Sequence, residues 1–109
     1  MSVPGIGIDI AEVKRFRRLS GRFLKRVYTD EEVAYCRRSV DPAMHFAARF
    51  AAKEAVIKAT TKTDIALKDI YVKNRASGAP EVFIKGKKKK FHISISHTKD
   101  IAVAVVISL

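Results

Sequence analysis

Segment 41–59 constrains the fold more than any other part of the chain. Asp41 is a favoured N-cap residue, and Pro42 suits the first helical position, where its missing N–H costs nothing. The residues that follow are rich in alanine, with Phe46 and Phe50 on a common side. This pattern predicts one long helix, and its small side chains permit other elements to approach the helix backbone closely.

A strand and shorter helices are predicted before this long helix. Residues 4–10 alternate β-branched residues with Gly and Asp, which favours a strand with Asp9 near its C-terminal end. Residues 12–27 carry apolar side chains at helical spacing, and Ser20-Gly21 can divide them into two pieces. A capping-box pattern at residues 29–32 predicts a further helix that ends near residue 38.

Strands dominate the second half of the chain, where the apolar period changes to two. The pattern predicts strands at 70–73, 82–85, 91–96 and 101–107. The last is almost continuously apolar, as in a strand covered on both faces, and the lysine run 85–90 is typical of a solvated turn. One strand, then helices, then antiparallel strands indicate an α+β class.

Length and composition indicate one globular domain, residues 1–109. Of these residues 48% are hydrophobic and 30% are charged. The single Cys36 excludes an internally disulfide-bonded scaffold and a Cys-rich zinc module. No apolar run approaches the ~20 residues of a membrane helix, and the first residues lack the basic stretch of a secretory signal. We therefore expect a cytoplasmic protein with no membrane partner.

The charge balance is strongly basic, with 22 Lys and Arg against 11 Asp and Glu and a net charge of +11. Seven of the cations lie in residues 12–26 and five in residues 85–90. Such a field attracts polyanions: nucleic acid, a phosphorylated cofactor, an anionic membrane or an acidic protein. Charge alone does not choose among them.

Two acidic residues stand out because their neighbours are apolar. Asp9 lies in an apolar strand, where a carboxylate is costly unless it is paired or binds a metal, although it can equally cap the element that follows. Glu54 lies between apolar residues of the long helix, where an acid is most often solvated or ion-paired. Together, two carboxylates on separate elements can hold Mg²⁺, with water and phosphate oxygens completing its shell.

A second cluster, Ser94, Ser96 and His97, offers two hydroxyls on one strand face and an imidazole at the strand end. Residues two or three apart on a strand do not reach each other in the geometry of a nucleophilic triad, so the hydroxyls fit better as phosphate or hydroxyl contacts. The histidine spacing does not suggest zinc, and the sequence has no phosphate-binding P-loop.

Three segments, taken in order, resemble the bacterial holo-(acyl-carrier-protein) synthases, the group I class of 4′-phosphopantetheinyl transferases. They are Gly5–Ile10 with Glu12 and Arg15, then Arg49–Ala55 with Lys58-Ala59, then Ser94–His97. The resemblance extends over essentially the whole chain. It implies the 4′-phosphopantetheinyl transferase fold, a mainly antiparallel sheet wrapped around a long central helix.

The resemblance also implies a reaction. Coenzyme A donates 4′-phosphopantetheine to a serine of apo-acyl carrier protein in fatty acid biosynthesis, and adenosine 3′,5′-bisphosphate is released. Asp9 and Glu54 match the residues that hold Mg²⁺ against the CoA diphosphate. The serine must lose a proton, and Asp9, Glu54, His97 or a water on the metal are candidates among which the sequence does not choose.

CoA contacts follow from the same resemblance at Lys58, Ser94, Ser96 and His97. The family usually has a Gly-Thr-Gly turn after the lysine that matches Lys58, whereas Thr60-Thr-Lys-Thr63 stands here. Without glycine the backbone cannot approach a phosphate in the same way, and Lys62 can substitute electrostatically. A helix that commonly precedes the Ser-x-Ser-His strand is also missing, because the lysine run is too short for one.

Partners follow too. An acidic acyl carrier protein is expected to dock on the basic first helix through Arg15, Arg22 and Arg26. Arg49 and Lys53 project from the same helix as Lys58, so each can contact a CoA phosphate as Lys58 does or can simply pair with acids on the surface. The family assembles as a homotrimer with active sites between protomers, and no nucleic acid is expected.

Two other interpretations stay open at this point. A small basic RNA-binding module accounts for the charge but not for the acids at Asp9 and Glu54. A structural subunit that kept the fold and lost activity is suggested by the missing glycines.

Overall fold

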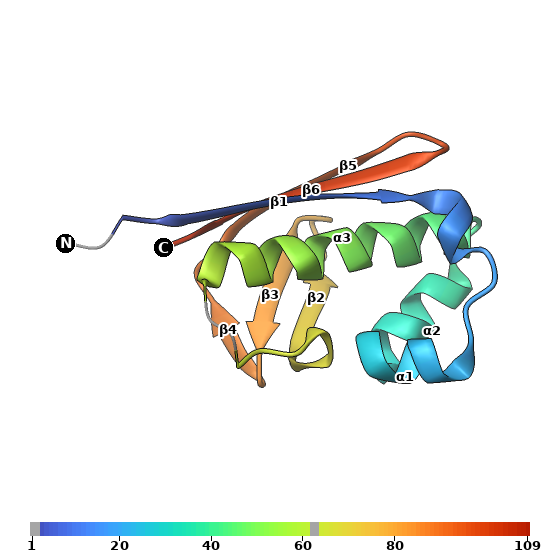
Figure 1. Ribbon diagram of the computed structural model, residues 1–109, viewed down its shortest axis with the longest axis horizontal. Helices are drawn as coiled ribbons and strands as arrows, with labels where there is room; N and C mark the ends of the chain where they lie inside the picture. The colour runs from blue at the N-terminus through green and yellow to red at the C-terminus, as the bar shows by residue number, and fades with distance from the viewer. Residues whose placement is uncertain (1–2, 62–63) are drawn as a thin grey trace.

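The computed structural model describes residues 3–61 and 64–109, and it has a long central helix packed against two antiparallel sheets (Figure 1). In chain order the described elements are β1 (Gly5–Glu12), the 3-10 helix η1 (Val13–Phe16), α1 (Gly21–Val27), α2 (Asp30–Arg38), α3 (Pro42–Thr60), the 3-10 helix η2 (Leu67–Asp69), β2 (Ile70–Asn74), β3 (Pro80–Ile84), β4 (Lys87–Lys89), β5 (His92–His97) and β6 (Ile101–Ser108). The α+β class is confirmed.

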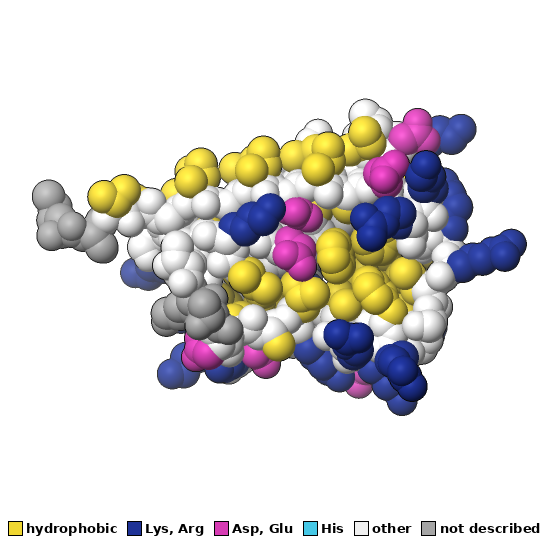
Figure 2. All heavy atoms as spheres, viewed as in Figure 1, with side chains coloured by type: hydrophobic (Ala, Val, Ile, Leu, Met, Phe, Trp, Pro, Cys, Tyr) yellow, Lys and Arg dark blue, Asp and Glu magenta, His cyan; other side chains and the backbone are white. Residues whose placement is uncertain are grey.

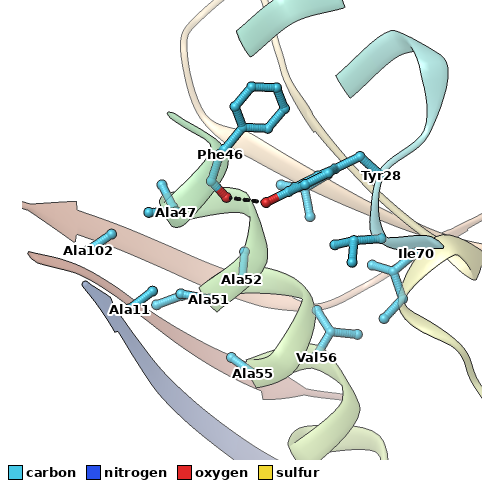
Figure 3. Packing of buried hydrophobic residues seen from close by; sticks show 14 of the residues in the cluster. Ala11, Tyr28, Phe46, Ala47, Ala51, Ala52, Ala55, Val56, Ile70 and Ala102 are labelled. Atoms are coloured by element: carbon cyan, nitrogen blue, oxygen red, sulfur yellow. Dashed lines mark hydrogen bonds between the residues drawn. The ribbon is translucent and has the colours of Figure 1, made fainter. Parts of the chain in front are cut away.

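The predicted long helix is α3, and the signals at its start act as expected. The Asp41 side chain accepts a hydrogen bond from the Met44 N–H, and Pro42 occupies the first turn. Alanines along α3 are fully buried, and in Figure 3 Ala51 points toward Ala11 of β1. Small side chains thus bring the strands close to the helix axis.

Strand β1 lies directly on the backbone of α3 because two of its residues have no side chain. A Cβ atom built on Gly7 would stand 2.0 Å from the Ala55 carbonyl oxygen, and one on Gly5 would stand 1.8 Å from that of Ala59. No larger residue fits either position. Because side chains alternate along a strand, Asp9 is on the same face as the two glycines and is brought to α3.

The first sheet has the order β1-β6-β5, with β6 in the centre. Its inner face packs on α3, but its outer face is covered by no described element: Ile6, Ile8 and Ile10 are 69%, 59% and 64% exposed. The register places Val103 and Val105 of β6 beside these isoleucines. The prediction that segment 101–107 is covered on both faces is therefore wrong for a single chain.

The second sheet has the order β2-β3-β4 and corrects the prediction for the lysine run. Lys85 and Gly86, both with positive φ, form a tight turn, and the next three lysines pair with β3 as strand β4. Lys88 also forms an ion pair with Glu81, with 3.0 Å between Nζ and Oε2. The lysine run therefore contributes a hairpin strand, because its backbone pairs with that of β3.

The shorter helices follow the predicted signals. Residues 12–27 do divide, into η1 and α1, and the Ser20 side chain caps α1 by accepting from the Phe23 N–H. The capping box of α2 is complete, since Thr29 Oγ1 accepts from the Glu32 N–H and Glu32 Oε1 accepts from the Thr29 N–H. Among the described residues, no helix combines the length and apolarity needed to cross a bilayer.

Candidate active site

Asp9 and Glu54, remote in sequence, lie within electrostatic range of each other and of Lys58. The Lys58 ammonium lies 3.2 Å from Asp9 Oδ1 and donates to the Ile8 carbonyl oxygen at 2.9 Å. Glu54 precedes Lys58 by one helical turn, so both side chains project from the same face of α3. Partial burial, then the negative charge of Asp9, raise the pKa of Glu54, while Lys58 lowers it. The two carboxylates therefore interact electrostatically.

This acidic pair fits a hard divalent cation that is shared with an anionic ligand. The described residues contain no cluster of three or more acidic, His or Cys side chains that would enclose a metal. Mg²⁺ usually binds through one or two carboxylates and keeps its other positions for water and substrate phosphate. Asp9 and Glu54 supply two carboxylates, and Lys58 supplies a cation beside them for phosphate.

Asp9 and Glu54 are both half-buried, so the acidic pair is in part open to solvent. In Figure 2 two acidic groups lie between a row of hydrophobic side chains along β1 and a broader hydrophobic patch. A pocket of about 330 Å³ lies between β1, η1, α1 and α3. Its apolar lining comes from Ile10, Phe16, Leu19, Phe23 and Phe50. We call it the aromatic pocket.

Arginines surround the aromatic pocket. Arg15, the leading carrier-binding candidate, lines it together with Arg18. Arg22 and Arg26 are exposed on α1, the helix that supplies Phe23. The sequence predicted the arginines but not the pocket, because aromatic residues at helical spacing are equally explained as core.

A second pocket, of about 170 Å³, gathers cationic and imidazole side chains on another side of α3. Arg49, His45 and His97 line it with Tyr35 and Asn74. We call it the basic pocket. Burial, then Arg49, then His97 lower the pKa of His45. Asp41 acts in the opposite direction, so the cationic neighbours of His45 are opposed by one carboxylate, and an anion would fit beside them.

Arg49 is the buried centre of the basic pocket, so of its two predicted roles the surface ion pair is wrong. Only 4% of it is exposed, and its guanidinium stacks 4.2 Å from the centre of the Tyr35 ring. Nη2 donates to Asn74 Oδ1 at 3.3 Å, while Nε has no hydrogen-bond acceptor among the described residues. Sequence reasoning missed His45, which has no motif around it.

Lys53 is also buried rather than at the surface. Its ammonium lies 2.5 Å from Glu32 Oε1, and neither side chain is exposed. Lys53 therefore lines neither the aromatic pocket nor the basic pocket, and it belongs to the core.

The structure separates the other predicted CoA residues. Ser94 and Ser96 pair with Val105 and Val103 on the outer face of the first sheet, whereas His97 reaches the basic pocket. Lys62 lies outside the described residues. Positions 49 and 54 are five residues apart, about 140° around the helix axis. The basic pocket and the acidic pair thus lie on nearly opposite sides of α3.

Comparisons with known proteins agree with one another. Residues 5–106 match the family model of the 4′-phosphopantetheinyl transferase superfamily. The holo-(acyl-carrier-protein) synthase of Thermodesulfovibrio yellowstonii is 46% identical over 110 residues, covering 96% of this chain and 97% of that protein.

Solved structures give the same result. A holo-(acyl-carrier-protein) synthase from Bacillus anthracis, in complex with CoA (3′,5′-ADP), superposes with a TM-score of 0.82 at 35% identity, covering 94% of this chain and 93% of that one. The Helicobacter pylori holo-(acyl-carrier-protein) synthase in complex with coenzyme A gives 0.79 at 28% identity, with 94% and 99% covered.

Proposed function

Because this chain belongs to the 4′-phosphopantetheinyl transferase superfamily, we propose that its acidic pair is the centre of a holo-(acyl-carrier-protein) synthase reaction. The chain is an enzyme that transfers 4′-phosphopantetheine from coenzyme A to a serine of apo-acyl carrier protein. The observation that carries the location is the meeting of Asp9 and Glu54 beside Lys58. An RNA-binding module would have no use for these carboxylates.

The reaction is a phosphoryl transfer. The serine oxygen forms a bond to the β-phosphorus of CoA, the bond from that phosphorus to the bridging oxygen breaks, and adenosine 3′,5′-bisphosphate leaves. Asp9 and Glu54 would hold Mg²⁺, which supplies neutralisation of the charge on the diphosphate oxygens. Lys58 contributes a further positive charge to the same oxygens. The serine proton goes to a base. Within one chain, the candidates for that base at this site are the carboxylates of Asp9 and Glu54.

The carrier side of the reaction is assigned to the aromatic pocket and its arginines. Arg15, Arg22 and Arg26 attract an acidic carrier, and the apolar lining accepts an apolar side chain of that carrier. Phe50 of the pocket stands one turn before Glu54 on α3. A carrier seated there presents its serine next to the acidic pair.

The basic pocket is assigned to the phosphorylated adenosine end of CoA. The unpaired Nε of Arg49 and the imidazoles of His45 and His97 suit a phosphate group. Since this pocket and the acidic pair lie on nearly opposite sides of α3, one CoA molecule uses both only when they come from different copies of the chain. His97 acts as the base only across that junction.

A homotrimer with active sites between protomers accounts for this division. The uncovered outer face of the first sheet, with its exposed isoleucines, supplies an apolar surface for assembly. Ser94 and Ser96 share that face, so their predicted CoA contacts would form at the junction of two copies. The proposed setting is fatty acid biosynthesis in the cytoplasm.

The decisive test is Glu54→Gln, which keeps the shape of the side chain and removes one metal ligand. Transfer from CoA to an apo-carrier, read as a mass increase on the carrier, should fall to background while the circular dichroism spectrum is unchanged. Glu31→Gln, at an exposed position of α2, is the matched control and should transfer normally. Near-normal turnover of Glu54→Gln would refute the assignment of the acidic pair.

A further inference from the structure

Lys53 uses all three of its ammonium protons inside the protein. Nζ donates to the Val27 carbonyl oxygen at 2.6 Å, to the Leu67 carbonyl oxygen at 3.2 Å, and to Glu32 Oε1 at 2.5 Å. These acceptors belong to the last residue of α1, to η2 and to the first turn of α2. One fully buried side chain of α3 therefore joins three other elements.

Glu32 is equally saturated. Its Oε1 also accepts from the Thr29 N–H at 2.9 Å, and its Oε2 accepts from the Val72 N–H of β2 at 2.8 Å. The charges also suit the helix ends, since the ammonium lies at the C-terminus of α1 and the carboxylate at the N-terminus of α2. The pair is thus placed at the joint between α1 and α2.

Helix α1 depends on this joint. It has seven residues, fewer than a helix needs to be stable alone in water. At its end, the Tyr28 hydroxyl donates to the Phe46 carbonyl oxygen of α3 at 2.8 Å, drawn as a dashed line in Figure 3. Lys53 and Tyr28 therefore fix the C-terminal end of α1 on α3 from two directions.

The position of α1 decides the shape of the aromatic pocket. Phe23 of α1 stacks on Phe50 of α3, with 6.1 Å between ring centres. Glu54 follows Lys53 directly in sequence. A shift of α1 on α3 would change the distance between the docked carrier and the acidic pair, and it would leave the acidic pair itself intact.

We infer that Lys53 is a positioning residue: with Tyr28 it holds α1 at the distance from Glu54 that lets a docked carrier present its serine. The inference rests on the proposed function and adds to it a buried residue that touches neither substrate. An ion pair with a purely structural role would stabilise the protein, and its loss would not affect carrier binding more than CoA binding.

The test compares Lys53→Met with the double variant Lys53→Met/Glu32→Gln in the full chain. The single variant leaves the Glu32 charge buried and unpaired, so it should lower the melting temperature strongly. The double variant removes both charges and should recover most of that loss. In the double variant we expect the KM for the apo-carrier to rise by about tenfold or more, at an unchanged Kd for CoA.

Controls separate positioning from stability. Val82→Ala removes buried volume in β3, whose residues are not among the hydrogen-bond partners of Lys53 and Glu32 named above, and should lower the melting temperature without changing the KM for the carrier. Equal carrier KM values in the wild type and the double variant would overturn the proposal, as would an equal loss of CoA binding.

A further variant covers the case in which the double variant does not fold. Tyr28→Phe keeps the ion pair and removes the other hydrogen bond at the joint, so it should raise the carrier KM as well. An unchanged KM in that variant would then overturn the proposal. Wild-type protein that transfers no pantetheine would refute the proposed function instead, which keeps the two failures distinct.

Discussion

At the scale of single residues, the acidic pair is defined by the charges around Glu54. Its pKa is raised by burial and by Asp9 and lowered by Lys58, so each neighbour has a predictable effect on its titration. Because the charged form is disfavoured, metal binding should weaken as the pH falls through this raised pKa. In the metal-free protein a raised pKa means that the folded state holds the Glu54 proton more tightly than the unfolded state does. The free energy of unfolding should therefore fall as the pH rises through the raised pKa of Glu54.

Substitution of the two neighbours tests these signs. Asp9→Asn should lower the pKa of Glu54, because a negative neighbour is removed, and Lys58→Met should raise it. Carboxyl carbon NMR titration of the metal-free protein would measure both shifts. Shifts of the same sign in the two variants would contradict the geometry of the acidic pair.

Arg15 tests the carrier side at the same scale. Arg15→Glu should weaken carrier binding and make it less dependent on salt, while the Kd for CoA measured by calorimetry stays unchanged. Lys87→Glu, on the exposed part of β4, makes the same change in net charge and is the matched control. Equal losses in both variants would mean that the summed charge of the chain, rather than Arg15, attracts the carrier.

The sequence singled out residues whose chemistry conflicts with their neighbours, and their role as metal ligands stays a prediction. Asp9 and Glu54 were recognisable as acids among apolar residues, and the structure brings them together. For Arg49 the sequence left a phosphate contact and a surface ion pair both open, because one arginine in a basic chain carries no signal. Its burial depends on the stacked Tyr35 ring and on Asn74, which only the folded chain brings near.

At the scale of elements, the contact between β1 and α3 positions Asp9. Gly7→Ala would place a methyl group 2.0 Å from the Ala55 carbonyl oxygen, so the strand must move away from the helix. We expect a loss of about 1–3 kcal/mol or more in the free energy of unfolding, measured by urea denaturation, together with loss of transfer.

Gly21→Ala is the matched control for this change. Nothing lies within 4 Å of a Cβ atom built there, at the first residue of α1. Its stability should rise by about 0.4–1 kcal/mol because the unfolded chain loses freedom. If both alanine variants were equally stable, the close approach of β1 to α3 would be disproved.

Helices were easier to predict than strand pairing. Caps and boxes are local signals, so α2 and α3 begin at the residues where their side chains bond. The strand β4 escaped prediction because lysines have little β-propensity and its pairing with β3 is decided by the positive-φ turn at Lys85-Gly86.

At the scale of the whole molecule, assembly is the property that the proposed mechanism requires. Val105→Lys would place a charge at the centre of the outer face of the first sheet, between Ile8 and Ser94. Burial of an unpaired charge is costly, so the variant should run as a monomer in light scattering and lose transfer. An active wild-type monomer would contradict the trimer.

Val40→Lys is the control at this scale. Val40 is a fully exposed apolar residue between α2 and α3 and belongs to neither sheet. Its substitution should change neither the mass of the assembly nor the rate of transfer. Sequence alone predicted an apolar β6 but could not say what would cover it, because a single chain contains no second copy.

Strand β1 combines both requirements in one stretch of eight residues. The even-numbered isoleucines of β1 lie on its exposed outer face, and the odd-numbered glycines and Asp9 lie on the face toward α3. Insertion or deletion of one residue there would exchange the two sets, pressing isoleucine side chains into α3 and turning the carboxylate away from it. The outer face of the strand can thus accept one aliphatic residue in place of another. The number of residues between Gly5 and Asp9, in contrast, cannot change even by one.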